Sequence, residues 1–143
     1  MTTYAEFLRS KERAWTGSGA SLGGSVLPTA LYPWQRAITE WALRKERACI
    51  FADCGLGKTL MQLAWADAVP GRVLILAPLC VGEQTAHEAD HLGVDAAYAA
   101  TADDISHKVT ITNYERLHRF DPSVFAGVVL DESSILKNDA GKI

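Results

Sequence analysis

Residues 50–60 read IFADCGLGKTL, and this stretch decides the fold of the chain. A short apolar run ends in a Gly-Leu-Gly-Lys-Thr turn, and a helical pattern follows it. Gly55 and Gly57 let the backbone turn tightly, so that its N–H groups reach phosphate oxygens at the positive end of the next helix. In such a loop Lys58 reaches the outer phosphates and the Thr59 hydroxyl ligates Mg²⁺. The stretch therefore predicts a strand, a phosphate-binding loop and a helix.

On either side of this loop the sequence alternates between apolar strand patterns and amphipathic helix patterns. Pro33 marks the first turn of a predicted helix, a position that proline favours. The predicted apolar face of this helix carries Trp34, Ile38, Trp41 and Ala42. Continuous apolar strands separated by helices are typical of an α/β fold with a parallel sheet. The predicted strands are 48–52, 73–77, 96–99, 109–112 and 128–131, and the later helices are 58–69, 82–92 and 114–120.

Composition bounds the remaining possibilities. The net charge of −3 is not the excess of basic residues that is typical of nucleic-acid-binding domains. No stretch of the sequence is both apolar enough and long enough to span a membrane. The three cysteines show no CxxC spacing, which favours reduced thiols and a cytoplasmic location over a zinc site. A short amphipathic helix at 3–14 and a Gly/Ser-rich linker make up residues 1–30, and residues 31–143 form one domain.

A second acidic motif follows the last predicted strand, in VVLDESSILKN at 128–138. Ligands of open α/β sheets sit beyond the carboxyl ends of the strands, which is where Asp131 and Glu132 fall. Asp131 is suited to hold Mg²⁺, and Glu132 is suited to polarise an attacking water, because phosphoryl transfer depends mostly on positioning and charge.

Together these motifs resemble the first RecA-like lobe of a superfamily-two helicase of the DEAD/DEAH type, nearest the Swi/Snf-like ATPases of phages and prophages. ADCGLGKT at 52–59 resembles its AxxGxGKT loop, DESS at 131–134 occupies the DEAH position, and LYPWQ at 31–35 resembles the Q motif. The resemblance implies a P-loop ATPase in which Gln35 reads adenine and so selects ATP over GTP. It implies catalytic roles for Lys58, Asp131 and Glu132, ATP contacts at Gln35, Gly55, Leu56, Gly57, Lys58, Thr59 and Leu60, and Mg²⁺ ligands at Thr59 and Asp131.

The resemblance also implies a nucleic-acid partner, DNA rather than RNA. LILAPLCVGEQ at 74–84 resembles motif Ia and TNYE at 112–115 resembles motif Ib, segments that follow a nucleic-acid strand in that family. The implied contacts are Pro78, Leu79, Cys80, Thr112, Asn113 and Tyr114. The family continues with a coupling motif and a second RecA-like lobe, so we expect residues 1–143 to be an incomplete lobe, nearly inactive alone, from a bacterial or phage-infected host cytoplasm.

Two alternatives of other classes stay open. One is a standalone nucleotide-binding module that regulates a partner without motor activity. The other is a zinc hydrolase, because HEADH at 87–91 matches the HExxH pattern that places two histidines on one helix face. That pattern also requires a third ligand and a catalytic cleft.

Overall fold

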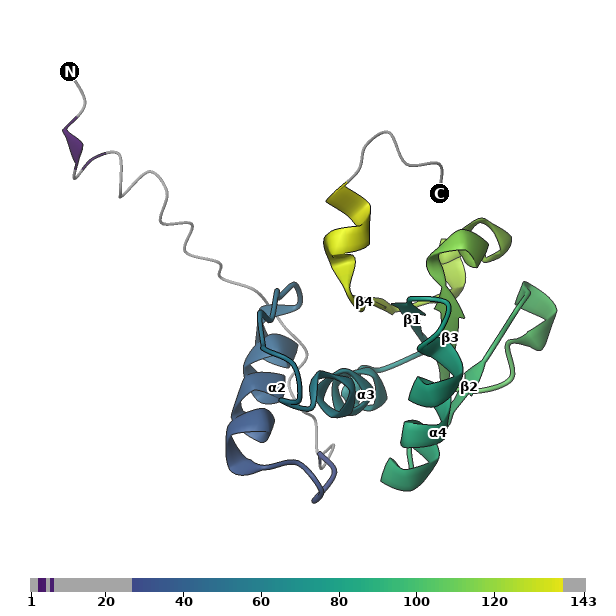
Figure 1. Ribbon diagram of the computed structural model, residues 1–143, viewed down its shortest axis with the longest axis horizontal. Coiled ribbons are helices and arrows are strands. Elements are labelled where there is room, and N and C mark those ends of the chain that lie inside the picture. The colour runs from purple at the N-terminus through teal and green to yellow at the C-terminus, as the bar shows by residue number, and fades with distance from the viewer. Residues whose placement is uncertain (1–2, 5, 7–26, 138–143) are drawn as a thin grey trace.

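The computed structural model describes residues 3, 4, 6 and 27–137. Most of the predicted helix at 3–14 and most of the Gly/Ser-rich linker therefore lie outside the described residues. The remaining chain alternates helices and strands (Figure 1). The elements are α2 (Pro33–Lys45), α3 (Lys58–Ala68), β1 (Val73–Ala77), α4 (Gly82–Leu92), β2 (Ala96–Tyr98), β3 (Val109–Asn113) and β4 (Gly127–Leu130), with short 3₁₀ segments η1 (Ala102–Asp104), η2 (Tyr114–Arg119), η3 (Pro122–Val124) and η4 (Ser133–Lys137).

Within the described residues the sheet has four strands, all parallel, in the order β2-β3-β1-β4. The central strand β1, VLILA, is buried along its whole length, as expected of a parallel strand covered on both faces. This confirms the predicted α/β fold with a parallel sheet flanked by helices. The predicted bounds of α3, α4 and the four strands agree with the structure to within one residue at each end.

The carboxyl ends of three strands meet at one edge of the sheet. Ala77 of β1 pairs with Asn113 of β3, and Leu76 pairs with Leu130 at the end of β4. The segments that follow these strands, beginning at Pro78, Tyr114 and Asp131, therefore start side by side. This edge brings together motifs that are far apart in the sequence.

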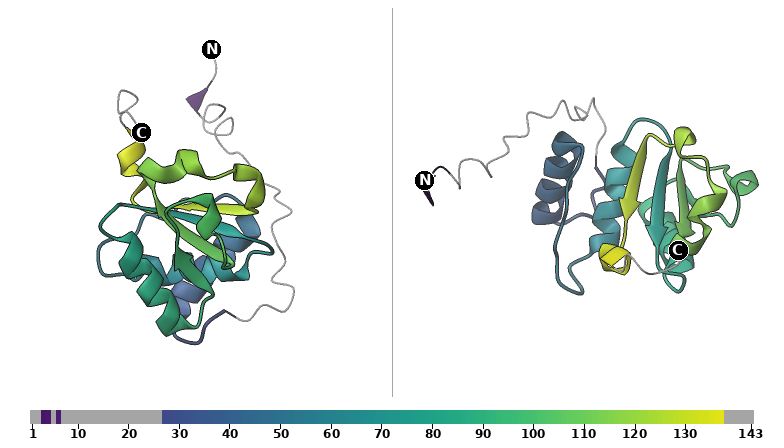
Figure 2. Two further views of the ribbon diagram at one scale, coloured as in Figure 1. Left: turned by 90° about the vertical axis from the view of Figure 1, so that its right-hand side faces the viewer. Right: turned by 90° about the horizontal axis from the view of Figure 1, so that it is seen from above.

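Helices α3 and α4 cover one face of the sheet. Leu63 of α3 and Ala89 of α4 form a buried cluster with alternate residues of β1 and β3, including Ile75 and Ile111. Helix α2 packs on the outer side of α3, where Leu43 meets Met61 and the chain before α2. Figure 2 shows the resulting order of α2, α3 and sheet. The layers hold the N-terminus of α3 in a fixed relation to the strand ends.

The opposite face of the sheet is covered more thinly. Leu74 and Leu76 of β1 form a small buried cluster there with Tyr114, against which Phe125 packs. The covering chain on this side is the stretch of 3₁₀ turns between β3 and β4 rather than an α-helix. At the edge of the sheet β4 carries Val128 and Leu130, which are exposed.

The prediction of a strand at 48–52 is wrong for this structure. These residues are irregular and join none of the described strands, and the Phe51 side chain is 96% exposed. A strand is stable only when a neighbour takes up its hydrogen bonds, and none of the described strands does so for this run. The apolar sequence is therefore not sufficient to form the strand.

The prediction for the buried face of α2 is right for Ala42 and Ile38, which are buried or packed against the core, and wrong for the two tryptophans. Trp34 and Trp41 are 42% and 41% exposed, and the fully buried positions are Gln35, Thr39, Ala42 and Leu43. The two polar residues tolerate burial because their polar atoms are hydrogen-bonded: Thr39 Oγ1 donates to the Gln35 carbonyl at 2.9 Å. Among the described residues no helix is both long and apolar enough to cross a membrane.

Candidate nucleotide-binding site

The loop between residue 52 and α3 has the backbone shape expected of an anion-binding turn. Gly55 and Gly57 have φ of +77° and +68°, a region that L-residues other than glycine rarely enter. Gly57 is the N-cap residue of α3, and no side chain of the described residues caps that helix. The N–H groups of the first turn therefore remain for an anion, where the helix dipole favours negative charge.

Lys58 lies in the first turn of α3 with its ammonium group turned back over the loop. Its Nζ donates to the carbonyl oxygens of Ala52 at 3.0 Å and Asp53 at 3.2 Å. In the part of the chain that the structure describes, no carboxylate lies within ion-pair distance of it. A half-buried positive charge with only neutral partners is well placed to exchange those carbonyls for phosphate oxygens.

The carboxylate after β4 lies against the same helix. Asp131 Oδ1 accepts a hydrogen bond from Gln62 Nε2 at 2.8 Å, and the Asp131 N–H donates to the Leu76 carbonyl at 2.8 Å. Gln62 is three residues after Thr59 on α3, so the two share one face of the helix. The structure thus holds Asp131 against the helix face that also carries Thr59, the other predicted Mg²⁺ ligand.

Tyr114 holds the main chain of the same aspartate. Its side chain is buried at 3% exposure, and its hydroxyl donates to the Asp131 carbonyl at 2.5 Å. Burial, and then the charges of Asp131 and Glu132, raise the pKa of Tyr114 to about 12. The phenol therefore stays neutral and remains a donor at ordinary pH.

Glu132 follows in an uncommon backbone conformation, with φ of +49° and an exposed side chain. A left-handed conformation costs a residue with a β-carbon about 1–2 kcal/mol, so the contacts around Asp131 must hold this turn in place. The result is that Asp131 turns toward α3 while Glu132 remains open to solvent.

The sequence analysis missed Gln62 altogether and assigned Tyr114 to nucleic acid. A signal for Gln62 exists in the sequence, since an amide one turn after the Lys-Thr pair shares their helix face. The contact of Tyr114 with Asp131 spans two strands and has no local signature.

Gln35, which the Q-motif resemblance assigns to adenine, lies close to the loop. Its side chain is 2% exposed; Oε1 accepts from the Tyr32 N–H at 2.9 Å and Nε2 donates to the Leu56 carbonyl at 3.1 Å. Leu56 itself is exposed and Leu60 is half-buried, both next to Gly57. The structure thus gathers Gln35, the loop and Asp131 around the N-terminus of α3.

The two segments expected to touch nucleic acid differ in accessibility. After β1, Leu79 and Cys80 are exposed and Pro78 is partly so. At the end of β3 and directly after it, the side chains of Thr112, Asn113 and Tyr114 are all buried at 3% exposure or less. They are engaged within the protein, Thr112 with the Ala99 carbonyl, Asn113 with the Tyr98 hydroxyl and Tyr114 with Asp131. A nucleic-acid contact through these three side chains therefore does not agree with the structure.

The HExxH histidines do meet on α4, with ring centroids 4.8 Å apart for His87 and His91. Across the described residues, however, no group of three or more histidine, cysteine or carboxylate side chains gathers around a possible metal ion. Within residues 27–137 the pair therefore has no third protein ligand of the kind that a catalytic zinc requires.

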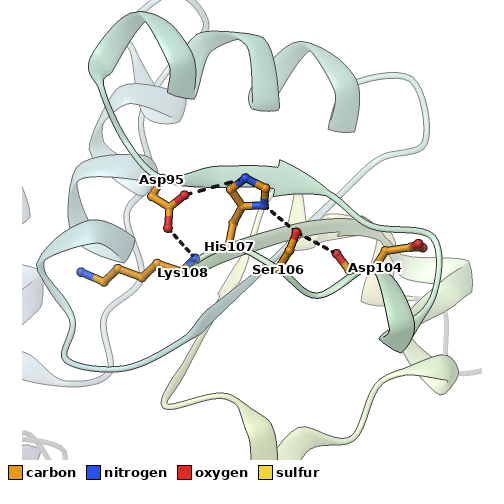
Figure 3. Close-up of polar contacts among 5 residues, drawn as sticks. All are labelled: Asp95, Asp104, Ser106, His107 and Lys108. Carbon is orange, nitrogen blue, oxygen red and sulfur yellow. Dashed lines mark hydrogen bonds and ion pairs between the residues drawn. The ribbon is translucent and has the colours of Figure 1, made fainter.

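A second polar cluster lies on the surface between β2 and β3 (Figure 3). Ser106 Oγ is 2.8 Å from His107 Nδ1, and His107 Nε2 is 3.9 Å from Asp95 Oδ1. The His107 and Asp95 side chains are 43% and 62% exposed, and an exposed pair of this kind interacts weakly. Asp95 also accepts from the Lys108 N–H at 3.0 Å, so these contacts close the loop rather than build a catalytic cleft.

A cavity of about 640 Å³ lies at the other end of β4, between Trp65, Leu43 and Gly127. It is remote in the fold from the carboxyl ends of the strands and has no part in the site. Comparison of the sequence with models of protein families and with curated proteins gives no match.

Proposed function

We propose that this chain is the ATP-binding lobe of an ATP-dependent DNA helicase or translocase. The observation that carries the proposal is the hydrogen bond from Gln62 to Asp131, which joins the phosphate-loop helix to the carboxylate that follows β4. A glycine loop before a helix is a weak signal alone. The same loop with an acidic group held beside its Lys-Thr turn is the pair of features that phosphoryl transfer needs.

The residues present fit a nucleoside triphosphate with its metal ion. The backbone of residues 55–60 and the Lys58 ammonium would hold the phosphate chain. Thr59 and Asp131 would supply the hard oxygen ligands that Mg²⁺ prefers. When bound, Mg²⁺ would neutralise charge on the phosphate oxygens. Glu132 is exposed beside Asp131, and its carboxylate would accept a proton from the attacking water.

The DNA part of the proposal is supported by the resemblance of motif Ia and by the exposed segment 78–80 at the same edge of the sheet. In such a motor a second RecA-like lobe would complete the ATP site and would step along the strand with this one. The buried side chains at 112–114 leave the segment after β1 as the contact we propose here.

The nucleotide site is tested by calorimetric titration of the chain with Mg-ATP. Lys58→Ala should weaken binding by about 10- to 100-fold, because hydrogen bonds to a charged group contribute about 1.5–3 kcal/mol. Lys45→Ala, which removes the same charge at the far end of α2, is the matched control and should bind as the wild type does. Equal affinity in the two variants would exclude the loop as the phosphate site.

DNA binding is tested separately by fluorescence anisotropy with single-stranded and duplex DNA at low salt. Leu79→Asp places a negative charge in the proposed contact and should weaken binding through repulsion of the phosphates. Ala37→Asp, an exposed position on α2, makes the same change of charge away from the sheet edge. If ATP binds but DNA does not, or if both variants bind DNA alike, the regulatory nucleotide-binding module replaces the translocase.

A further inference from the structure

The outer face of α4 carries two histidines one helical turn apart. His87 and His91 are both exposed, and their ring centroids lie 4.8 Å apart with the ring planes inclined at 60°. Residues four positions apart stand above one another on a helix, which is why the two rings meet. The buried residues Thr85 and Ala89 lie on the opposite side of α4, so the histidine pair faces away from the sheet.

The separation of the two rings is the one that a shared metal ion requires. The centroid of a bound imidazole lies on the line of its metal–nitrogen bond, which for Zn²⁺ is about 2.0–2.1 Å long. At ligand angles of about 90–110°, the centroids of two bound rings therefore lie about 4.5–5.3 Å apart. The observed 4.8 Å falls within this range. Because the terminal torsion of histidine is soft, each ring can aim a nitrogen at such an ion with little strain.

The acidic residues of α4 leave both rings available for a metal ion. Within residues 27–137 neither His87 nor His91 lies within ion-pair distance of a carboxylate. Glu88, which follows the first histidine, instead accepts a hydrogen bond from Gln84 Nε2 at 3.4 Å. No salt bridge therefore has to break before the two imidazoles bind a metal ion.

We propose that α4 carries a surface metal site in which His87 and His91 together bind one transition-metal ion of the class Zn²⁺, Ni²⁺ or Cu²⁺. Imidazole suits these ions, whereas Mg²⁺ prefers oxygen ligands, so this site and the phosphate loop select different metals. With two protein ligands rather than three, it differs from a hydrolytic zinc site. The ion links two successive turns of α4 and, because it binds the folded chain, stabilises it by mass action.

The test is calorimetric titration of the chain with Ni²⁺. Nickel is the probe because the three exposed cysteines of the chain would compete more strongly for zinc. Wild type should bind one ion at this site. His87→Ala and His91→Ala should each weaken that binding by about 10- to 100-fold or more, since even an outer-shell partner of a metal ligand contributes that much.

His118→Ala is the matched control, because it removes an exposed histidine from η2 rather than from α4. This variant should bind Ni²⁺ as wild type does. Equal affinity in wild type and both α4 variants would place the ion elsewhere and overturn the proposal. Two ions on wild type, one of which each α4 variant keeps at unchanged affinity, would show separate sites and overturn it as well.

Melting temperature gives a second readout that depends on the same pair. Excess Ni²⁺ should raise the melting temperature of wild type and of His118→Ala more than that of His91→Ala, each compared with its own metal-free value. Mg²⁺ should produce no such difference between the three proteins. A nickel shift that is the same in all three would refute the site on α4. Neither measurement involves a nucleotide, so the result is independent of the proposed ATP site.

Discussion

Replacement of Tyr114 by phenylalanine removes a single hydroxyl from a buried part of the site. That hydroxyl donates to the Asp131 carbonyl at 2.5 Å, and the side chain is 3% exposed. A hydrogen bond of this kind contributes about 0.5–1.5 kcal/mol. At pH 8 we therefore expect Tyr114→Phe to lower the free energy of unfolding by about 1 kcal/mol.

At high pH the same substitution should cost much less stability. The pKa of Tyr114 is raised from 10.0 to about 12 in the folded protein, by burial and then by the charges of Asp131 and Glu132. Between these two values the unfolded chain has lost this proton while the folded chain retains it, so wild-type stability falls as pH rises through this window. Within this window the free energy of unfolding falls by about 1.4 kcal/mol for each pH unit. Solvent screening weakens the effect, so we expect wild type to lose about 1 kcal/mol between pH 8 and pH 11. Phenylalanine has no proton to lose.

The assay is urea unfolding followed by tryptophan fluorescence, for wild type and Tyr114→Phe at pH 8 and pH 11. The other titrating groups are common to both proteins, so they cancel in the difference between them. That difference should fall from about 1 kcal/mol at pH 8 to near zero at pH 11. A difference that stays the same at both pH values would show that Tyr114 is not a buried neutral donor to Asp131.

Three further changes test the chemistry and the packing. Glu132→Gln, in a form that hydrolyses ATP, should slow steady-state hydrolysis by about 10²–10⁴-fold with ATP affinity kept, and an unchanged rate would exclude Glu132 as the base. Leu63→Ala empties a fully buried position under the sheet and should cost about 2–5 kcal/mol in urea unfolding; a loss well below this would contradict the described core. Gly82→Ala places a β-carbon 2.8 Å from the Tyr98 ring and should cost about 1–3 kcal/mol, whereas full stability would mean that the ring moves freely.

The strands and helices that local sequence marks strongly could be predicted. The run at 73–77 is uninterrupted and apolar, and Pro70-Gly71 ends the preceding helix, so β1 and α3 have clear limits. The run at 48–52 has the same apolar character and forms no strand. The difference between the two runs is the presence of a neighbour, which depends on the arrangement of the whole sheet rather than on the run itself.

The site shows the same division between local and distant information. The loop at 55–59 and Asp131 follow from motifs, because their chemistry is tied to a turn or to a strand end. Gln62 and Tyr114 contact Asp131 across 69 and 17 residues of chain. Helix spacing places Gln62 on the face of the Lys-Thr pair but does not report its partner, and no local pattern reports the contact of Tyr114. The prediction for the buried face of α2 failed in part for a related reason: Gln35 is buried because its polar atoms have partners, which hydrophobicity patterns do not register.

The order of strands in the sheet has a consequence for how the chain is made. The central strand β1 is completed at Ala77, but its two neighbours begin only at Val109 and Gly127. Parallel strands cannot pair through a tight hairpin, so on the ribosome the apolar sequence VLILA must wait for both partners to be synthesised. We expect that interval to be the period in which the nascent chain most needs a chaperone.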